Sequence, residues 1–286
     1  MFASLANGWE YARLSYALLW EKKSLCIFPA LSVLGCGCVL LGFYAPLVGS
    51  EGLQAFFAGL EASDGSGLTP AGYGILFAYY FANYFVVVFF NSALVHCALE
   101  LMERGETSLA SGLSAALARL PQIAGWALLS AGVGVLLRTL EKHERLSGLV
   151  AAILGTAWTV LTALAVPVIV AEGVGPLEAF KRSSRAIAKC WGPAVVGNFS
   201  LGIAGLLYLF PLLLGGLLFL FLGGRQDPWG SGLPLLAVGG FLFAWALALS
   251  SAADVVFRAV LYRYVVGGRL PSHAHDVPLS AAFARK

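Results

Sequence analysis

The chain has 286 residues, of which 59% are hydrophobic and only 12% are charged, and its mean hydropathy is +0.83. Soluble domains carry roughly 25% charged residues, so this composition excludes an ordinary soluble protein. The formal net charge of +3 is small for a chain of this length, and we expect no nucleic-acid partner.

Six apolar stretches are long enough to cross a bilayer, and the alternating segments of a β-barrel are absent from the sequence. At about 1.5 Å of rise per residue, a helix over each stretch reaches or approaches the ~30 Å thickness of the hydrocarbon layer. A helix also satisfies its own backbone hydrogen bonds in lipid. The sequence therefore predicts an all-α membrane protein, with spans at 25–48, 72–95, 122–140, 148–171, 194–222 and 233–253.

Amphipathic segments precede three of these spans, at 5–24, 107–120 and 176–190. Each segment has apolar residues at helical spacing, with basic residues on the other face or at the end. Helices of this kind lie in the headgroup region of a membrane. We therefore predict three interfacial amphipathic helices in addition to the six spans.

The three amphipathic segments share the pattern S-x-A-[LI], which begins at Ser15, Ser114 and Ser184. In each case a predicted span follows within a few turns of helix. This recurrence predicts a single membrane domain, 1–286, built from three units that each combine an interfacial helix with a two-span hairpin. The predicted units are about 4–102, 106–171 and 175–266, followed by a tail at 267–286.

The basic residues predict the orientation of the chain. With the N-terminus inside, fourteen of the 18 lysines and arginines fall on the inner side. Such a bias is typical of cytoplasmic loops, so we expect both termini in the cytoplasm. Each basic residue near an anionic leaflet contributes about 1 kcal/mol toward binding it. The candidates for lipid-headgroup binding are Lys22, Lys23, Arg119, Lys181, Arg182, Arg185 and Lys189.

Polar residues in the second predicted span are candidates for a polar path. Asn83 and Asn91 are eight residues apart, about 80° around a helix, and can flank one face. A buried asparagine in lipid needs a partner, so these two either bond neighbouring helices or line a path. Ser92, His96 and Glu100 then follow at helical spacing. They fit a proton relay or a solvated cluster where the helix leaves the membrane.

The end of the last predicted span carries Asp254 and Arg258 at i, i+4 spacing. An acid that precedes a base by four residues is the favourable order for an ion pair on a helix. The pair is a candidate for lining the polar path or for anchoring the end of the helix. Motifs of metalloproteases, P-loop proteins and serine hydrolases are absent, so we expect no enzyme activity, no cofactor and no metal site.

Three stretches of the sequence resemble a family of uncharacterised bacterial polytopic membrane proteins. They are FVVVFFNSALVHCALE at 85–100, GWALLSAGVGVLLRTL at 125–140 and AVPVIVAEGVGPLEAFKRS at 165–183, with Cys-Trp-Gly at 190–192. The resemblance covers roughly 10–225 and implies a location in the bacterial cytoplasmic membrane. More loosely, the arrangement is similar to the membrane domain fused to some bacterial glycerophosphodiesterases, whose catalytic half this chain lacks.

Two functional hypotheses follow from these patterns. The first is a pore, transport or lipid-handling protein without coupled transport, because almost no ionisable residue lies at mid-membrane. The second is a non-catalytic membrane organiser that associates with copies of itself or with a membrane-protein partner. Membrane lipids are the expected partner in both.

Overall fold

The structure is a computed structural model that describes residues 15–16, 18–44, 68–141, 148–189 and 233–267. Within these ranges the chain is almost entirely helical and contains no β-strand. The elements are η1 (Lys23–Cys26), α2 (Ile27–Tyr44), α4 (Pro70–Arg104), α5 (Leu109–Ala118), α6 (Leu120–Glu141), α7 (Gly148–Leu161), α8 (Ala165–Glu172), α9 (Pro176–Lys189) and α12 (Leu233–Gly267).

Four stretches of helix in the described part of the chain are long and apolar enough to cross a membrane. They agree with the first four predicted spans and are Lys23–Phe43, Pro70–Arg104, Leu120–Leu140 and Val150–Glu172. The fifth predicted span, 194–222, lies outside the described residues. The sixth, 233–253, falls within the 35-residue helix α12, which is not among these four.

Helix α4 is the central helix of the described structure. Over its most apolar window 56% of residues are buried, against 28–33% for the other three candidate spans. Its 35 residues extend about 52 Å at the usual rise, which exceeds the ~30 Å hydrocarbon layer. The side chain of Thr69 caps its first turn, and Gly105 ends it with a φ of +73°. A helix of this length that crosses the hydrocarbon layer extends beyond it.

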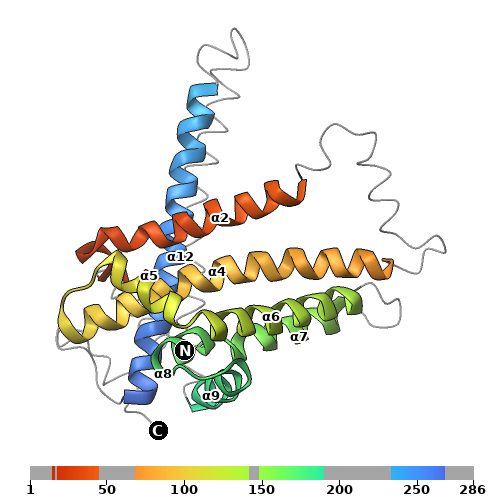
Figure 1. Cartoon of the computed structure of the whole chain (residues 1–286). Coiled ribbons are helices and arrows are strands. Elements are labelled where there is room, and N and C mark those ends of the chain that lie inside the picture. Colours follow the sequence, from red (N-terminus) through yellow and green to blue (C-terminus); the bar gives the residue numbers. More distant parts are fainter. Residues whose placement is uncertain (1–14, 17, 45–67, 142–147, 190–232, 268–286) are drawn as a thin grey trace.

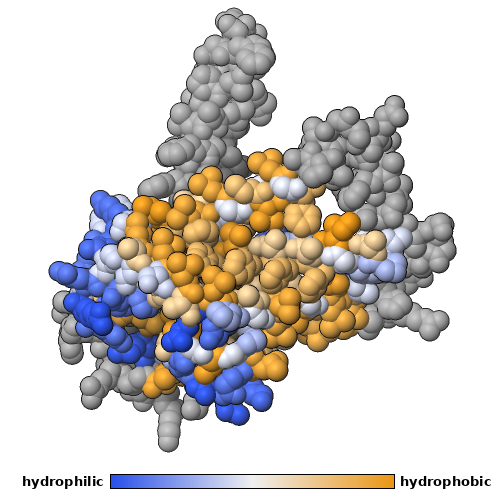
Figure 2. All heavy atoms as spheres, in the orientation of Figure 1, coloured by the Kyte–Doolittle hydropathy of each residue, from blue (hydrophilic) through white to orange (hydrophobic). Residues whose placement is uncertain are grey.

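Figure 1 shows α2, α4, α6 and α7 running side by side, while α12 crosses this row at a steep angle and packs against α4 and α2. Figure 2 shows that hydrophobic residues cover the row. Hydrophilic residues gather at the end of the molecule where α4 ends and α5 lies. Large apolar side chains such as Val33, Leu136 and Ile153 are more than half exposed, as expected of helices that face lipid.

The fourth candidate span is broken between α7 and α8. Pro167 lies in the first turn of α8, where its missing N–H costs no hydrogen bond. The hydroxyl of Ser183, on α9, accepts a hydrogen bond from the Leu164 N–H at 3.1 Å and donates one to the Leu161 carbonyl at 2.6 Å. Ser183 thus satisfies backbone groups that the break exposes, and it fixes α9 against the broken span.

Three stacked aromatic rings join α6, α7 and α9. The rings of Trp126 and Trp158 lie 6.0 Å apart at 9°, and those of Trp158 and Phe180 lie 5.6 Å apart at 17°. Offset stacking of this kind adds to the gain from burial. It holds the amphipathic helix α9 beside the ends of α6 and α7.

Helices α5 and α9 lie within two of the three predicted interfacial segments. Of the first segment, 5–24, only residues 15–16 and 18–24 are described. The serines of the shared pattern differ in burial: Ser15 is buried, Ser184 is half-buried and Ser114 is exposed. The division into three units stays a prediction, and the tail beyond residue 267 lies outside the described residues.

Candidate functional site

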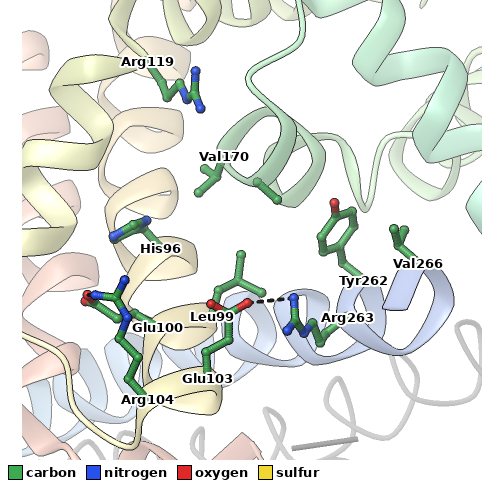
Figure 3. Close-up of a pocket in the computed structure, with 11 residues that line it drawn as sticks. His96, Leu99, Glu100, Glu103, Arg104, Arg119, Val170, Tyr262, Arg263 and Val266 are labelled. Atoms are coloured by element: carbon green, nitrogen blue, oxygen red, sulfur yellow. Dashed lines mark hydrogen bonds and ion pairs between the residues drawn. The ribbon is translucent and has the colours of Figure 1, made fainter. Parts of the chain in front are cut away.

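A cavity of about 460 Å³ lies at the polar end of the molecule, and we call it the α4–α12 cavity. Its walls come from the last turns of α4 and α12, the junction of α5 with α6, and the end of α8 (Figure 3). Its lining residues are His96, Leu99, Glu100, Glu103, Arg104, Arg119, Val170, Ala171, Tyr262, Arg263 and Val266. Two residues that the sequence marks as polar-path candidates, His96 and Glu100, therefore share a cavity with the headgroup candidate Arg119.

Glu100 is the centre of a hydrogen-bond network on the α4 side of the cavity. Its carboxylate accepts hydrogen bonds from Thr107 at 2.9 Å and Ser111 at 2.8 Å, and it pairs with Arg104 at 3.2 Å. The Ser111 hydroxyl also lies 3.3 Å from His96 Nε2. Because a carboxylate only accepts hydrogen bonds, the Ser111 hydroxyl donates its hydrogen bond to Glu100. His96 Nε2 must then be protonated and donate to the Ser111 oxygen. These contacts fix α5 to the end of α4.

Two carboxylates join α12 to the rest of the cavity wall. Glu103 on α4 pairs with Arg263 at 2.7 Å, as Figure 3 shows. Glu172, at the end of α8, accepts a 2.8 Å hydrogen bond from the Tyr262 hydroxyl and pairs with Arg182 on α9. Burial, together with the hydrogen bond to Glu172, raises the pKa of Tyr262 above its usual value, so the phenol keeps its proton.

Arg119 is held against the backbone where α8 ends. Gly173 has a φ of +66°, and a Cβ atom added there would lie 2.3 Å from Arg119 Nη1 and 2.6 Å from its Cζ. Only glycine lets the guanidinium approach this closely. No ion pair joins Arg119 to a carboxylate within the described ranges. Arg119 therefore presents an uncompensated positive charge in the cavity wall.

A second, smaller cavity of about 120 Å³ lies between α4, α12 and the turn before α8. Asn91, Ser251, Asp254 and Arg258 supply its polar lining. The predicted helical ion pair is confirmed, because Arg258 Nη2 lies 2.7 Å from Asp254 Oδ2. The structure thus brings three of the polar-path candidates together, apart from the α4–α12 cavity.

The remaining polar-path candidates do not reach either cavity. Asn83 donates a 2.9 Å hydrogen bond to the Tyr79 carbonyl of its own helix, so its amide is satisfied locally. Ser92 is fully buried, and its hydroxyl has no hydrogen-bond partner among the described residues.

Among the headgroup candidates other than Arg119, the side chains that the structure describes are exposed or half-buried. Lys23 is exposed, with its ammonium 4.9 Å from the Trp20 ring, and Lys22 is half-buried. Lys181 and Arg185 are exposed on α9, whereas the Lys189 side chain lies outside the described ones.

Arg182 differs from its neighbours on α9 because it pairs with Glu172 and, at 2.9 Å, with Glu178. The hydrogen bond from Arg182 lowers the pKa of the Glu178 carboxyl. The positive charge of Arg182 is therefore neutralised by carboxylates of the protein itself.

Several residues of the α4–α12 cavity were not among the candidates from sequence. Glu103, Tyr262 and Arg263 reach the site only because α12 packs against α4.

Comparison with known proteins gives a family and no activity. The model of a family of unknown function (DUF6159) matches residues 70–271, which is more than half of the chain. The chain belongs to this family. No curated protein and no solved structure matches the chain. The matched region contains every lining residue of the α4–α12 cavity.

Proposed function

We propose that the protein is a lipid-handling membrane protein that receives lipid headgroups in the α4–α12 cavity. In this proposal it has six spans and three interfacial helices, lies in the bacterial cytoplasmic membrane and keeps both termini in the cytoplasm. The cavity then opens at the inner leaflet. No catalytic step and no coupled transport is part of the proposal.

The observation that supports it is the composition of the cavity and its place at the ends of the spans. The volume of about 460 Å³ lies within the ~300–1,000 Å³ range of small-molecule sites. Arginine and histidine side chains line it together with the apolar Leu99, Val170 and Val266. A site lined by both charged and apolar side chains suits a headgroup with its attached glycerol.

The pore hypothesis has less support from the same geometry. Of its two asparagines, Asn83 is satisfied within its own helix, and Asn91 lines a cavity of only about 120 Å³. The organiser hypothesis rests on the exposed basic residues of α9, Lys181 and Arg185. A pore predicts solute flux through the membrane, which lipid handling does not.

Native mass spectrometry of the full chain, released from detergent after reconstitution with membrane lipid, tests the proposal. Ala171 lines the cavity and is exposed, so Ala171→Trp fills part of the space. Leu177→Trp, at a 65% exposed position on α9 outside the lining, is the matched control. We expect wild type and Leu177→Trp to retain bound lipid and Ala171→Trp to lose it. Equal retention by all three proteins would reject the proposal.

A further inference from the structure

The α4–α12 cavity contains one positive charge more than its own carboxylates neutralise. Its lining holds three guanidinium groups and two carboxylates, with histidine counted as neutral. Arg104 pairs with Glu100 at 3.2 Å, and Arg263 pairs with Glu103 at 2.7 Å. Arg119 is left over. A ligand with a single negative charge would complete the balance.

Arg119 is already oriented for such a ligand. The backbone at Gly173 packs against one side of its guanidinium. A guanidinium has five N–H donors in a planar fork, which matches the oxygens of a phosphate in a bidentate contact. No hydrogen bond joins these donors to another residue in the described part of the chain. Figure 3 shows Arg119 at the opposite side of the cavity from the Glu103–Arg263 pair.

The apolar part of the lining indicates what is attached to the phosphate. Leu99, Val170 and Val266 have apolar side chains; Leu99 and Val170 are largely buried, and Val266 is 58% exposed. A small inorganic ion would leave this apolar surface uncovered. A phosphate diester that carries glycerol and the first carbons of acyl chains would bury it, at about 25 cal/mol per Å² of apolar surface.

We propose that the α4–α12 cavity binds the singly charged phosphate diester of an anionic phospholipid, with Arg119 as the charge partner of the phosphate. The inference rests on the proposed function and adds the chemical class of the ligand. A zwitterionic headgroup is disfavoured because its ammonium would lie among three arginines. Both carboxylates of the lining, which could balance that ammonium, already pair with Arg104 and Arg263. The lipid is therefore one whose headgroup has no cation.

The test compares phosphatidylglycerol with phosphatidylcholine of the same acyl chains, at equal mole fraction in nanodiscs or mixed micelles. Lipid bound to the full chain is counted by native mass spectrometry. We expect wild type to prefer phosphatidylglycerol roughly tenfold, equivalent to about 1.4 kcal/mol. Arg119→Gln should remove the preference, and Arg119→Lys should retain part of it.

Arg138→Gln is the matched control, because it removes an exposed arginine from the last turn of α6, at the other end of that helix from Arg119 and outside the cavity. It should leave the preference intact. A preference that survives in Arg119→Gln, or one that Arg138→Gln removes equally, would overturn the assignment. The wild-type comparison needs no variant, so an Arg119→Gln protein that fails to fold still leaves a decisive measurement: no preference in wild type overturns the inference.

A competition arm separates a membrane lipid from a soluble phosphate diester. Glycerophosphoglycerol has the same headgroup chemistry as phosphatidylglycerol but no acyl chains, and we expect it to compete at least tenfold less well. Equal competition would show that the site takes a soluble ligand and would overturn the lipid assignment. Bound lipid without charge preference would reject this inference alone, whereas no bound lipid at all would reject the proposed function as well.

Discussion

The hydroxyl of Tyr262 donates a 2.8 Å hydrogen bond to Glu172 Oε1, across ninety residues of sequence. This bond ties α12 to the end of α8, where the same carboxylate also holds Arg182 of α9. One carboxylate thus connects three helices at the wall of the α4–α12 cavity. The cavity depends on this connection because Tyr262 and its neighbour Arg263 both line it.

Replacing Tyr262 with phenylalanine should destabilise the protein by about 1–3 kcal/mol, because a hydrogen bond to a charged group is lost. The measurement is an SDS unfolding titration in mixed micelles. Tyr84→Phe is the control: Tyr84 is 37% exposed on α4, and none of the described hydrogen bonds involves its hydroxyl. Equal stability of the two variants would contradict the role given to the Tyr262–Glu172 bond.

Ser183 provides a second test of how the fold is held together. Ser183→Ala would leave the Leu164 N–H and the Leu161 carbonyl without their partner at a fully buried site. We expect a loss of about 2–6 kcal/mol of unfolding free energy, since each of the two unsatisfied groups costs about 1–3 kcal/mol. Ser184→Ala removes only a local bond to the Lys181 carbonyl and should change stability little. A small effect at both positions would contradict the account of the α7–α8 break.

Gly112 marks the closest approach of α5 to α4. A Cβ atom there would lie 2.5 Å from Cys97 Sγ and 2.8 Å from the Ala93 carbonyl oxygen. Gly112→Ala should therefore cost about 1–3 kcal/mol and separate the two helices. Gly37→Ala, where a Cβ meets nothing within 4 Å, should be neutral or slightly stabilising in its helix. The same unfolding titration separates the two outcomes, and a neutral Gly112→Ala would argue against tight α4–α5 packing.

A flux measurement distinguishes lipid handling from a pore. We expect proteoliposomes that contain the wild-type chain to release ions and small solutes no faster than empty vesicles. If a route does pass Asn91, wild type will conduct and Asn91→Leu will reduce the flux while folding normally. Conductance that falls in Asn91→Leu would favour the pore and count against the proposal.

Features that depend on neighbouring residues were predictable from sequence. The first four spans follow from hydropathy, and the Asp254–Arg258 pair follows from i, i+4 spacing on one helix. Proline also limits a helix locally, and Pro167 lies in the first turn of α8, just after the break in the fourth span. In each case the chemistry that decides the outcome lies within a few turns of the residue itself.

The sequence contains no comparable local signal for contacts that join distant segments. The Ser183 hydroxyl satisfies the backbone groups that the α7–α8 break exposes. Nothing near Ser183 in the sequence predicts this contact with another helix. The packing of the Arg119 guanidinium against the Gly173 backbone likewise depends on how the end of α8 packs against α6. The sequence identified Arg119 and His96 as separate candidates, and only packing places them in one cavity.

The most direct test of the central claim is photocrosslinking with an anionic phospholipid whose headgroup carries a photoreactive group, followed by peptide mapping of the full chain in a bilayer. The account predicts adducts on the α4 segment 96–104 and the α12 segment 262–266, which line the α4–α12 cavity. Ala171→Trp should reduce these adducts. Adducts confined to the lipid-facing surfaces of α2 and α6, unchanged in Ala171→Trp, would contradict it.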